Sequence, residues 1–252
     1  MNNQTYERAN IMNPVIKQLK ERKSVRVFTD RPITEEEKYA ILEAAVNAPT
    51  AGCQQLYTII DVTDQKLKDA LVETCDHQPF IATAPLVLVF CADCRKWYNA
   101  FKEYGCEPRD PGVGDLMLAV SDTNIAAQNA VVAAHSLGIG SCYIGDIMEN
   151  AEEQRKLLCL PEFVFPCAML VFGYPTEQQL NRQKPSRAEM KHIVHQNGYR
   201  DMDKDELKDT LSANLGEKCF EDWIKAFCNR KYNSDFSREM TRSVKVFLED
   251  FE

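Results

Sequence analysis

Ala84-Pro85-Leu86-Val87-Leu88-Val89-Phe90-Cys91 and the alanine-rich stretch from Asp115 to Leu137 decide the fold of this 252-residue chain. The first stretch is a continuous apolar run, which is typical of a central strand buried on both faces. The second is apolar almost all round, so it predicts a long, buried central helix. Gly138-Ile139-Gly140 ends that helix. Together they predict an α+β core in which a sheet packs against one long helix.

Weaker sequence patterns before and after these two stretches predict further helices and strands. A capping box at Thr34-Glu35-Glu36-Glu37 begins a helix that stops at Ala48-Pro49. Periodicity predicts further helices over 14–19, 64–74 and 152–158, and strands over 57–62, 141–144 and 166–172. Gly112 and Gly114 indicate a loop. Helical pattern returns from 204 to 251, so we expect a main domain over 1–200 and a C-terminal helical extension over 201–252, which belongs to the same domain or to a dimer interface.

Composition excludes several classes of function. A formal charge of -8 argues against binding to nucleic acid or an anionic membrane, because both require a basic surface. No apolar run is long enough for a membrane span, and the first eight residues lack the apolar core of a signal peptide. We therefore expect a cytoplasmic protein. Its ten cysteines are then reduced thiols that act as small hydrophobic residues.

Two basic clusters stand out in this acidic chain. Arg22, Lys23 and Arg26 flank Ser24, and Lys184 and Arg187 follow the last predicted strand. Guanidinium groups bind phosphate oxygens bidentately and hydroxyl groups add short hydrogen bonds, so both clusters are candidate phosphate ligands. The alternative is an ordinary solvated surface. The sequence has neither a Walker A motif nor a GxGxxG after a strand.

Metal binding is not expected. Cys91 and Cys94 have CxxC spacing, but no second ligand pair has a matching place, since His192 and His195 lie after the phosphate motif. His135 falls within the long helix and is interpreted as a core or interface residue. No run of cysteines for an iron–sulfur cluster is present.

Four motifs in order resemble the FMN-dependent nitroreductase family. Arg22-Lys23-Ser24-Val25-Arg26-Val27-Phe28 resembles its opening R-x-S-x-R-x-F signature, and Ala48-Pro49-Thr50-Ala51-Gly52 with Gln54-Gln55 resembles its proline–threonine loop. Tyr143-Ile144-Gly145 and Lys184-Pro185-Ser186-Arg187 complete the series. The segment 58–91 is especially similar to the subgroup of larger oxygen-insensitive nitroreductases and NAD(P)H:flavin oxidoreductases. The resemblance extends to about Asn197 and, more faintly, into the C-terminal region.

This resemblance implies a fold and a binding site. The fold is a central, mostly antiparallel sheet flanked by helices, with the C-terminal extension wrapping a dimer partner. FMN lies at the interface of a homodimer. The residues implied to bind it are Arg22, Lys23, Ser24, Arg26, Thr50, Gln78, Tyr143, Ile144, Gly145, Lys184 and Arg187.

The implied activity is a ping-pong exchange in which NAD(P)H passes hydride to FMN and an acceptor then takes the electrons. Acceptors are nitroaromatics, quinones or free flavins, and no side chain is expected to be an indispensable nucleophile or base, because the cofactor performs the chemistry. Cys53 and Arg242 are the candidate substrate contacts; the alternatives are a loop-filling residue and a surface arginine. The sequence is compatible with either NADH or NADPH as the electron donor. The alternative function is a non-catalytic flavin-binding carrier or redox sensor.

Overall fold

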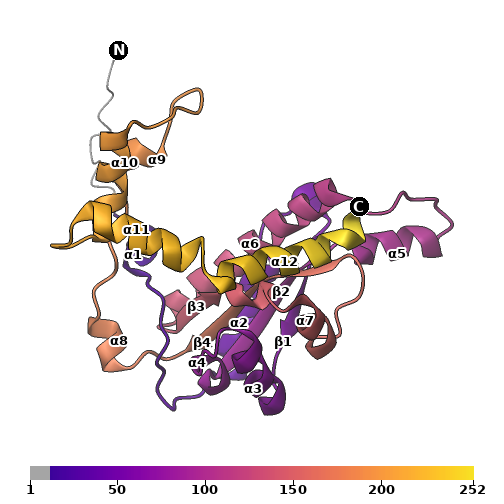
Figure 1. The fold of residues 1–252 in the computed structure, drawn as a ribbon. Coiled ribbons are helices and arrows are strands. Elements are labelled where there is room, and N and C mark those ends of the chain that lie inside the picture. Colours follow the sequence, from indigo (N-terminus) through magenta and orange to yellow (C-terminus); the bar gives the residue numbers. More distant parts are fainter. Residues whose placement is uncertain (1–11) are drawn as a thin grey trace.

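A four-stranded antiparallel sheet forms the centre of the molecule (Figure 1). The computed structural model describes residues 12–252. The strand order is β1 (Tyr57–Asp61), β2 (Leu86–Asp93), β4 (Val164–Gly173) and β3 (Gly140–Ile144). The N-terminal residues from which we inferred the lack of an export signal lie outside the described residues. The antiparallel arrangement confirms the predicted fold class.

Helices cover both faces of this sheet. Alternate residues of β2 face opposite sides: Leu88 and Phe90 belong to one hydrophobic cluster, and Val87 and Val89 to the other. The first cluster packs under α2 (Glu35–Val46) and most of α6 (Val113–Ser136), and the second under α3 (Gln65–Thr74), α7 (Ala151–Leu157) and α12 (Asp235–Leu248). Because neither face meets water, β2 and β4 are buried along their whole length. The predicted central strand is confirmed, although it begins at Leu86.

The long helix α6 differs from its prediction in two ways. Gly114 lies inside the helix, so the expectation of a loop at this glycine is wrong. The expectation of burial all round is also wrong, because only one face touches the sheet. Met117, Leu118 and Ile125 on the opposite face are 59%, 53% and 41% exposed. The single chain therefore presents an apolar stripe along α6.

The remaining elements are short. They are α1 (Pro14–Glu21), η1 (Ala51–Cys53), α4 (Phe80–Thr83), α5 (Arg95–Glu103), η2 (Gly145–Met148), α8 (Glu177–Asn181), α9 (Met190–Ile193), α10 (Lys204–Leu211), η3 (Ser212–Asn214), α11 (Phe220–Lys231) and η4 (Glu249–Phe251). The sequence did not predict α4, α5, α8 or α9. Between residues 12 and 252, no helix is long and apolar enough to cross a membrane.

The C-terminal region has two parts. Helices α9, α10 and α11 lie apart from the sheet at one end of the molecule, whereas α12 returns across it (Figure 1). Phe247 and Phe251 are buried in the same hydrophobic cluster as β2 and β4. The last helix is thus part of the core, and the division of the chain at residue 200 stays a prediction.

Candidate functional site

The segment from Arg22 to Phe28 lies along the sheet edge formed by β3. The Val25 amide donates to the Ser141 carbonyl at 2.9 Å, and the Thr29 amide donates to the Tyr174 carbonyl at 2.8 Å. Two glycines permit this close approach. A Cβ on Gly140 would lie 2.6 Å from the Val25 side chain, and one on Gly173 would lie 2.6 Å from the Phe28 ring. The segment is therefore held in one position against the sheet.

The second basic motif is tied to this segment by side chains that donate to backbone carbonyls. The Lys23 ammonium donates to the carbonyls of Leu180 and Arg182, at 2.6 and 2.5 Å. The Arg182 guanidinium donates to the Ser24 carbonyl. The Lys184 ammonium donates to the Lys20 carbonyl at 2.7 Å, near the end of α1. These contacts join two motifs that are far apart in the chain, and the Arg22 guanidinium takes no part in them.

Arg22 is the central cation of the site. Its guanidinium lies 5.8 Å from the centre of the Tyr143 ring, and its Nε and one Nη are buried without a hydrogen-bond partner among the described residues. Burial lowers the pKa of Arg22, and the neighbouring charge of Arg187 adds to this. The pKa of Lys184 is lowered by burial and then by the charges of Arg187 and Arg22.

Within residues 12–252, no carboxylate pairs with Arg22, Lys184 or Arg187. A buried cation without a counter-charge is costly, so this arrangement fits an anion that completes the site. A phosphate group supplies oxygens in the geometry that a guanidinium fork matches. The residues present therefore fit the phosphate of FMN.

A row of side chains continues from Arg22 along the β3 edge. Arg26 lies 5.9 Å from the centre of the Phe80 ring, two residues after Gln78. The Gln78 amide donates to the Asp146 carboxylate at 2.9 Å and to the Cys75 carbonyl at 3.1 Å. Asp146 follows Gly145 directly, so Gln78 lies beside the end of β3 that carries Tyr143 and Ile144. The structure thus brings most of the predicted flavin ligands into one region.

Three features of this row of residues were not predicted from the sequence. Asp146 orients Gln78, and its position directly after the Tyr143-Ile144-Gly145 motif was the available signal. A Cβ on Gly145 would meet only the end of Met148, at 3.8 Å, so the single chain imposes no steric need for glycine there. Burial raises the pKa of the Tyr143 phenol to about 12, so this group stays neutral.

The Thr50 loop lies apart from the basic cluster in the fold. The Thr50 hydroxyl donates to the Asp122 carboxylate, which also accepts from the Ala51 amide at 2.9 Å. His135, on the same helix as Asp122, lines a cavity together with Arg22. At the helical rise of about 1.5 Å per residue, these two positions on α6 are about 20 Å apart. One chain therefore does not bring Thr50, or the neighbouring exposed Cys53, to the basic cluster.

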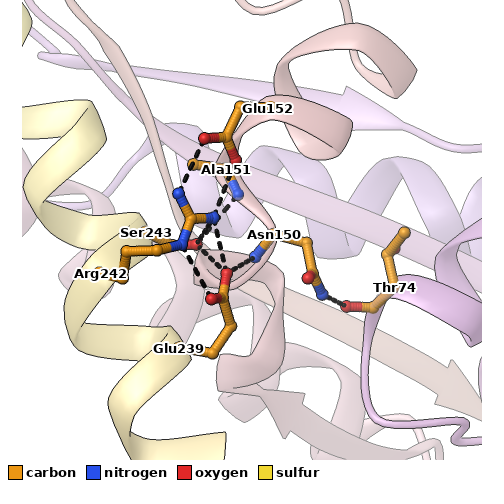
Figure 2. A network of polar contacts seen from close by, with 7 residues as sticks. All are labelled: Thr74, Asn150, Ala151, Glu152, Glu239, Arg242 and Ser243. Atoms are coloured by element: carbon orange, nitrogen blue, oxygen red, sulfur yellow. Dashed lines mark hydrogen bonds and ion pairs between the residues drawn. The ribbon is translucent and has the colours of Figure 1, made fainter.

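Arg242 lies on α12 within a polar network (Figure 2). It forms a bidentate pair with Glu152 at 2.8 Å and a second pair with Glu239 at 2.8–2.9 Å. Glu239 also accepts from the Asn150 amide at 3.2 Å and from the Ser243 hydroxyl at 2.7 Å. These contacts fasten α12 to the start of α7.

A buried carboxyl group connects this network with the region of Gln78. Burial, and then the negative charges of Asp146, Asp76 and Glu239, raise the pKa of Glu149 to about 7. One Glu149 oxygen has no hydrogen-bond partner among the described residues. The sequence did not predict this acidic group, because its members come from three separate segments.

The cysteine pair at 91 and 94 does not resemble a reactive site. Both thiols are buried, and burial raises the pKa of Cys94 to about 12 and that of Cys91 still further. They are therefore protonated, whereas a metal ligand or nucleophile requires a thiolate. Among the described residues, no group of three or more His, Cys, Asp or Glu side chains is placed to share a metal ion.

Comparisons with known proteins point to one family. A family model described as the nitroreductase family matches residues 19–174. The FMN reductase [NAD(P)H] of Bacillus subtilis is 32% identical over 241 residues, which cover 94% of this chain and 92% of the relative. The oxygen-insensitive NADPH nitroreductase of Salmonella typhimurium is 36% identical over 194 residues, covering 77% and 78%.

The fold also matches solved structures. Nitroreductase A from Vibrio parahaemolyticus superposes with a TM-score of 0.76 at 26% identity, over 86% of this chain and 91% of that one. The match in fold joins the match in sequence, and the family model spans the Arg22 signature, the Thr50 loop and the Tyr143 motif. The chain belongs to the nitroreductase family.

Proposed function

We propose that this protein is an FMN-dependent oxidoreductase that takes hydride from NAD(P)H and delivers it to nitroaromatics, quinones or free flavins. The observation that carries the proposal is the half-buried Arg22 guanidinium, which lies beside Tyr143 and has two buried nitrogens without a partner among residues 12–252. Family membership and relatives named FMN reductase and NADPH nitroreductase support the same reaction class.

The basic residues and Ser24 have different roles in binding the cofactor. Arg22, Lys184 and Arg187 bind the phosphate, and Ser24 and Arg26 extend this site along β3. Lys23 contributes indirectly, because its ammonium fixes the backbone around Leu180. When bound, FMN supplies a ring that accepts and donates hydride, so the protein provides binding and orientation.

The ring lies next to the row of residues at the end of β3. Gln78 hydrogen-bonds the ring edge while Asp146 holds its amide in place. The backbone of Tyr143, Ile144 and Gly145 runs beside the ring. None of these groups transfers a proton to the substrate in this proposal, which agrees with the neutral, half-buried phenol of Tyr143.

A homodimer completes the site in this proposal. Thr50 and Cys53 lie beside a position on α6 that is about 20 Å from the position beside the basic cluster, so one chain keeps the Thr50 loop apart from the phosphate ligands. The exposed apolar stripe of α6 offers a surface that a second copy would bury. The separate position of α9–α11 supports an extension that wraps this partner. The Thr50 loop of one copy then meets the flavin bound by the other.

Two further assignments belong to this proposal. Cys53 and Arg242 contact the substrate, and the pairs with Glu152 and Glu239 position the Arg242 guanidinium for this role. The protein works in the cytoplasm, where its ten free cysteines stay reduced.

The test is the visible spectrum of the purified protein, followed by anaerobic addition of NADH or NADPH. Flavin absorption that one nucleotide bleaches and a nitroaromatic or quinone restores would support the proposal and identify the electron donor. Bound flavin that neither nucleotide bleaches would favour the carrier or sensor. A colourless protein that FMN cannot reconstitute would refute the proposal.

A further inference from the structure

A cleft with aromatic walls lies between α5 and the start of α6, on the side of α6 that carries Leu118. Trp97, Tyr98 and Phe101 of α5 line one side, and the Trp97 and Phe101 ring centres are 5.7 Å apart. Leu56 lines the cleft as well. Its volume is about 290 Å³, which is at the lower end of the range for small-molecule pockets. The cleft therefore accommodates a few fused rings rather than a whole dinucleotide.

The charged groups around this cleft are already paired. Arg109 forms a bidentate pair with Asp115 at 2.6 and 3.0 Å. The Tyr98 hydroxyl lies 2.5 Å from an oxygen of Asp110, to which it donates. A ligand would thus meet ring faces and the paired charges of Arg109 and Asp115, while the Asp110 carboxylate accepts from Tyr98. The chemistry favours a flat, uncharged aromatic molecule.

One polar group in the cleft is free, and it belongs to the Thr50 loop. The Trp97 indole donates to the Gln54 carbonyl at 2.8 Å, which fastens α5 to this loop. The Gln54 side chain lines the cleft and makes no hydrogen bond within the part of the chain that the structure describes. Its amide can donate to a carbonyl or nitro oxygen of a ligand whose rings lie against Trp97 and Phe101.

We propose that this cleft binds the rings of a neutral, fused-ring quinone acceptor and thereby sets the preference among acceptors. Gln54 donates to an acceptor oxygen, and Phe101 forms part of the wall. This inference rests on the proposed function, because the loop that carries Gln54 lies beside a flavin only when a second copy completes the site.

The test uses Trp97 as a reporter in the oxidised holoenzyme. The chain has two tryptophans, so Trp223→Phe leaves Trp97 as the single fluorophore of this kind. Titration with 2-methyl-1,4-naphthoquinone, without any nicotinamide nucleotide, should quench Trp97 in a saturable way. Phe101→Ala in the same background should raise the Kd about tenfold, because one aromatic wall is lost. Phe101 is 39% exposed and lies on a helix with no buried residue, so we expect Phe101→Ala to fold like the parent.

Turnover supplies the second readout. In Phe101→Ala, the KM for the naphthoquinone should rise about tenfold, while kcat, the KM for the nicotinamide donor and the rate with ferricyanide stay unchanged. Phe220→Ala is the matched control, because it removes one ring of an aromatic pair on α11, outside the cleft.

The outcomes separate this inference from the proposed function. Quinone reduction with no saturable quenching of Trp97, or with an unchanged KM in Phe101→Ala, overturns the cleft and leaves the oxidoreductase intact. Quenching by NADP⁺ in place of the quinone also overturns it. A parent protein that binds no flavin refutes the proposed function itself, and the titration of Trp97 does not depend on turnover.

Discussion

Replacing Arg22 with methionine should weaken flavin binding strongly and leave the apoprotein at least as stable as the parent. Two guanidinium nitrogens of Arg22 are buried without a partner among residues 12–252, and each can donate to a phosphate oxygen. A hydrogen bond between charged groups contributes about 1.5–3 kcal/mol. Two of them correspond to about 3–6 kcal/mol, which raises the Kd for FMN by roughly 10²–10⁴-fold.

The apoprotein should respond in the opposite direction. Methionine keeps much of the volume and removes a half-buried charge that lacks a counter-charge. Such a replacement is often neutral or stabilising. A gain of about 1 kcal/mol would raise the Tm of a chain of this length by about 2–4 °C. The assays are titration of FMN fluorescence with apoprotein and thermal unfolding without flavin.

Two variants serve as controls. Arg22→Lys keeps the charge and loses the planar fork, so its FMN affinity should be intermediate. Arg238→Met removes an exposed arginine paired with Asp235 on α12 and should change neither quantity. If Arg22→Met binds FMN within threefold of the parent, the phosphate site has been placed wrongly.

Three further predictions follow from other parts of the molecule. Gly140→Ala should lower the Tm and weaken FMN binding, because its Cβ would lie 2.6 Å from the Val25 side chain, and overpacking of this kind costs about 1–3 kcal/mol of stability. The control is Gly114→Ala in α6, where a Cβ meets open space; this variant should be slightly more stable than the parent. Burial raises the pKa of Glu149 to about 7 from an ordinary 4.5, so the folded protein retains a proton that the unfolded chain releases, and stability is lost as the pH rises between these values. Glu149→Gln should therefore gain Tm relative to the parent from pH 5 to pH 8, and an equal difference at both ends would contradict this. Cys53→Ser should retain FMN on purification, because the thiol is exposed on a loop; a colourless variant would show a structural role.

The sequence predicted those parts of the fold in which burial is uniform. Strands β2 and β4 and helix α6 are apolar over long stretches, because the sheet is covered on both faces. Helix α5 was missed, since no residue of it is buried and the side chain of its N-cap residue, Cys94, makes no capping hydrogen bond. The exposed face of α6 was misread, because an apolar stripe has the same pattern whether it faces the core or the surface.

The motifs of the site could be predicted from the sequence, but the contacts between these motifs could not. The basic residues at both ends were marked by their contrast with an acidic chain. The Lys23 ammonium donates to the carbonyls of Leu180 and Arg182, which are 157 and 159 residues away in the sequence. No local sequence pattern encodes contacts of this kind. Asp122, which holds the Thr50 loop, had one available signal: it is a carboxylate on the buried face of a mostly apolar helix.

The long span of these contacts determines when the cofactor site can form during synthesis. The segment around Arg22 leaves the ribosome early, but its position depends on β3 and on carbonyls near residue 180. Contacts between distant segments form late, because closing a long loop costs entropy. The nascent chain therefore has no binding site for the flavin until most of its length has been translated. FMN stabilises the finished fold by mass action and takes no part in guiding its early steps.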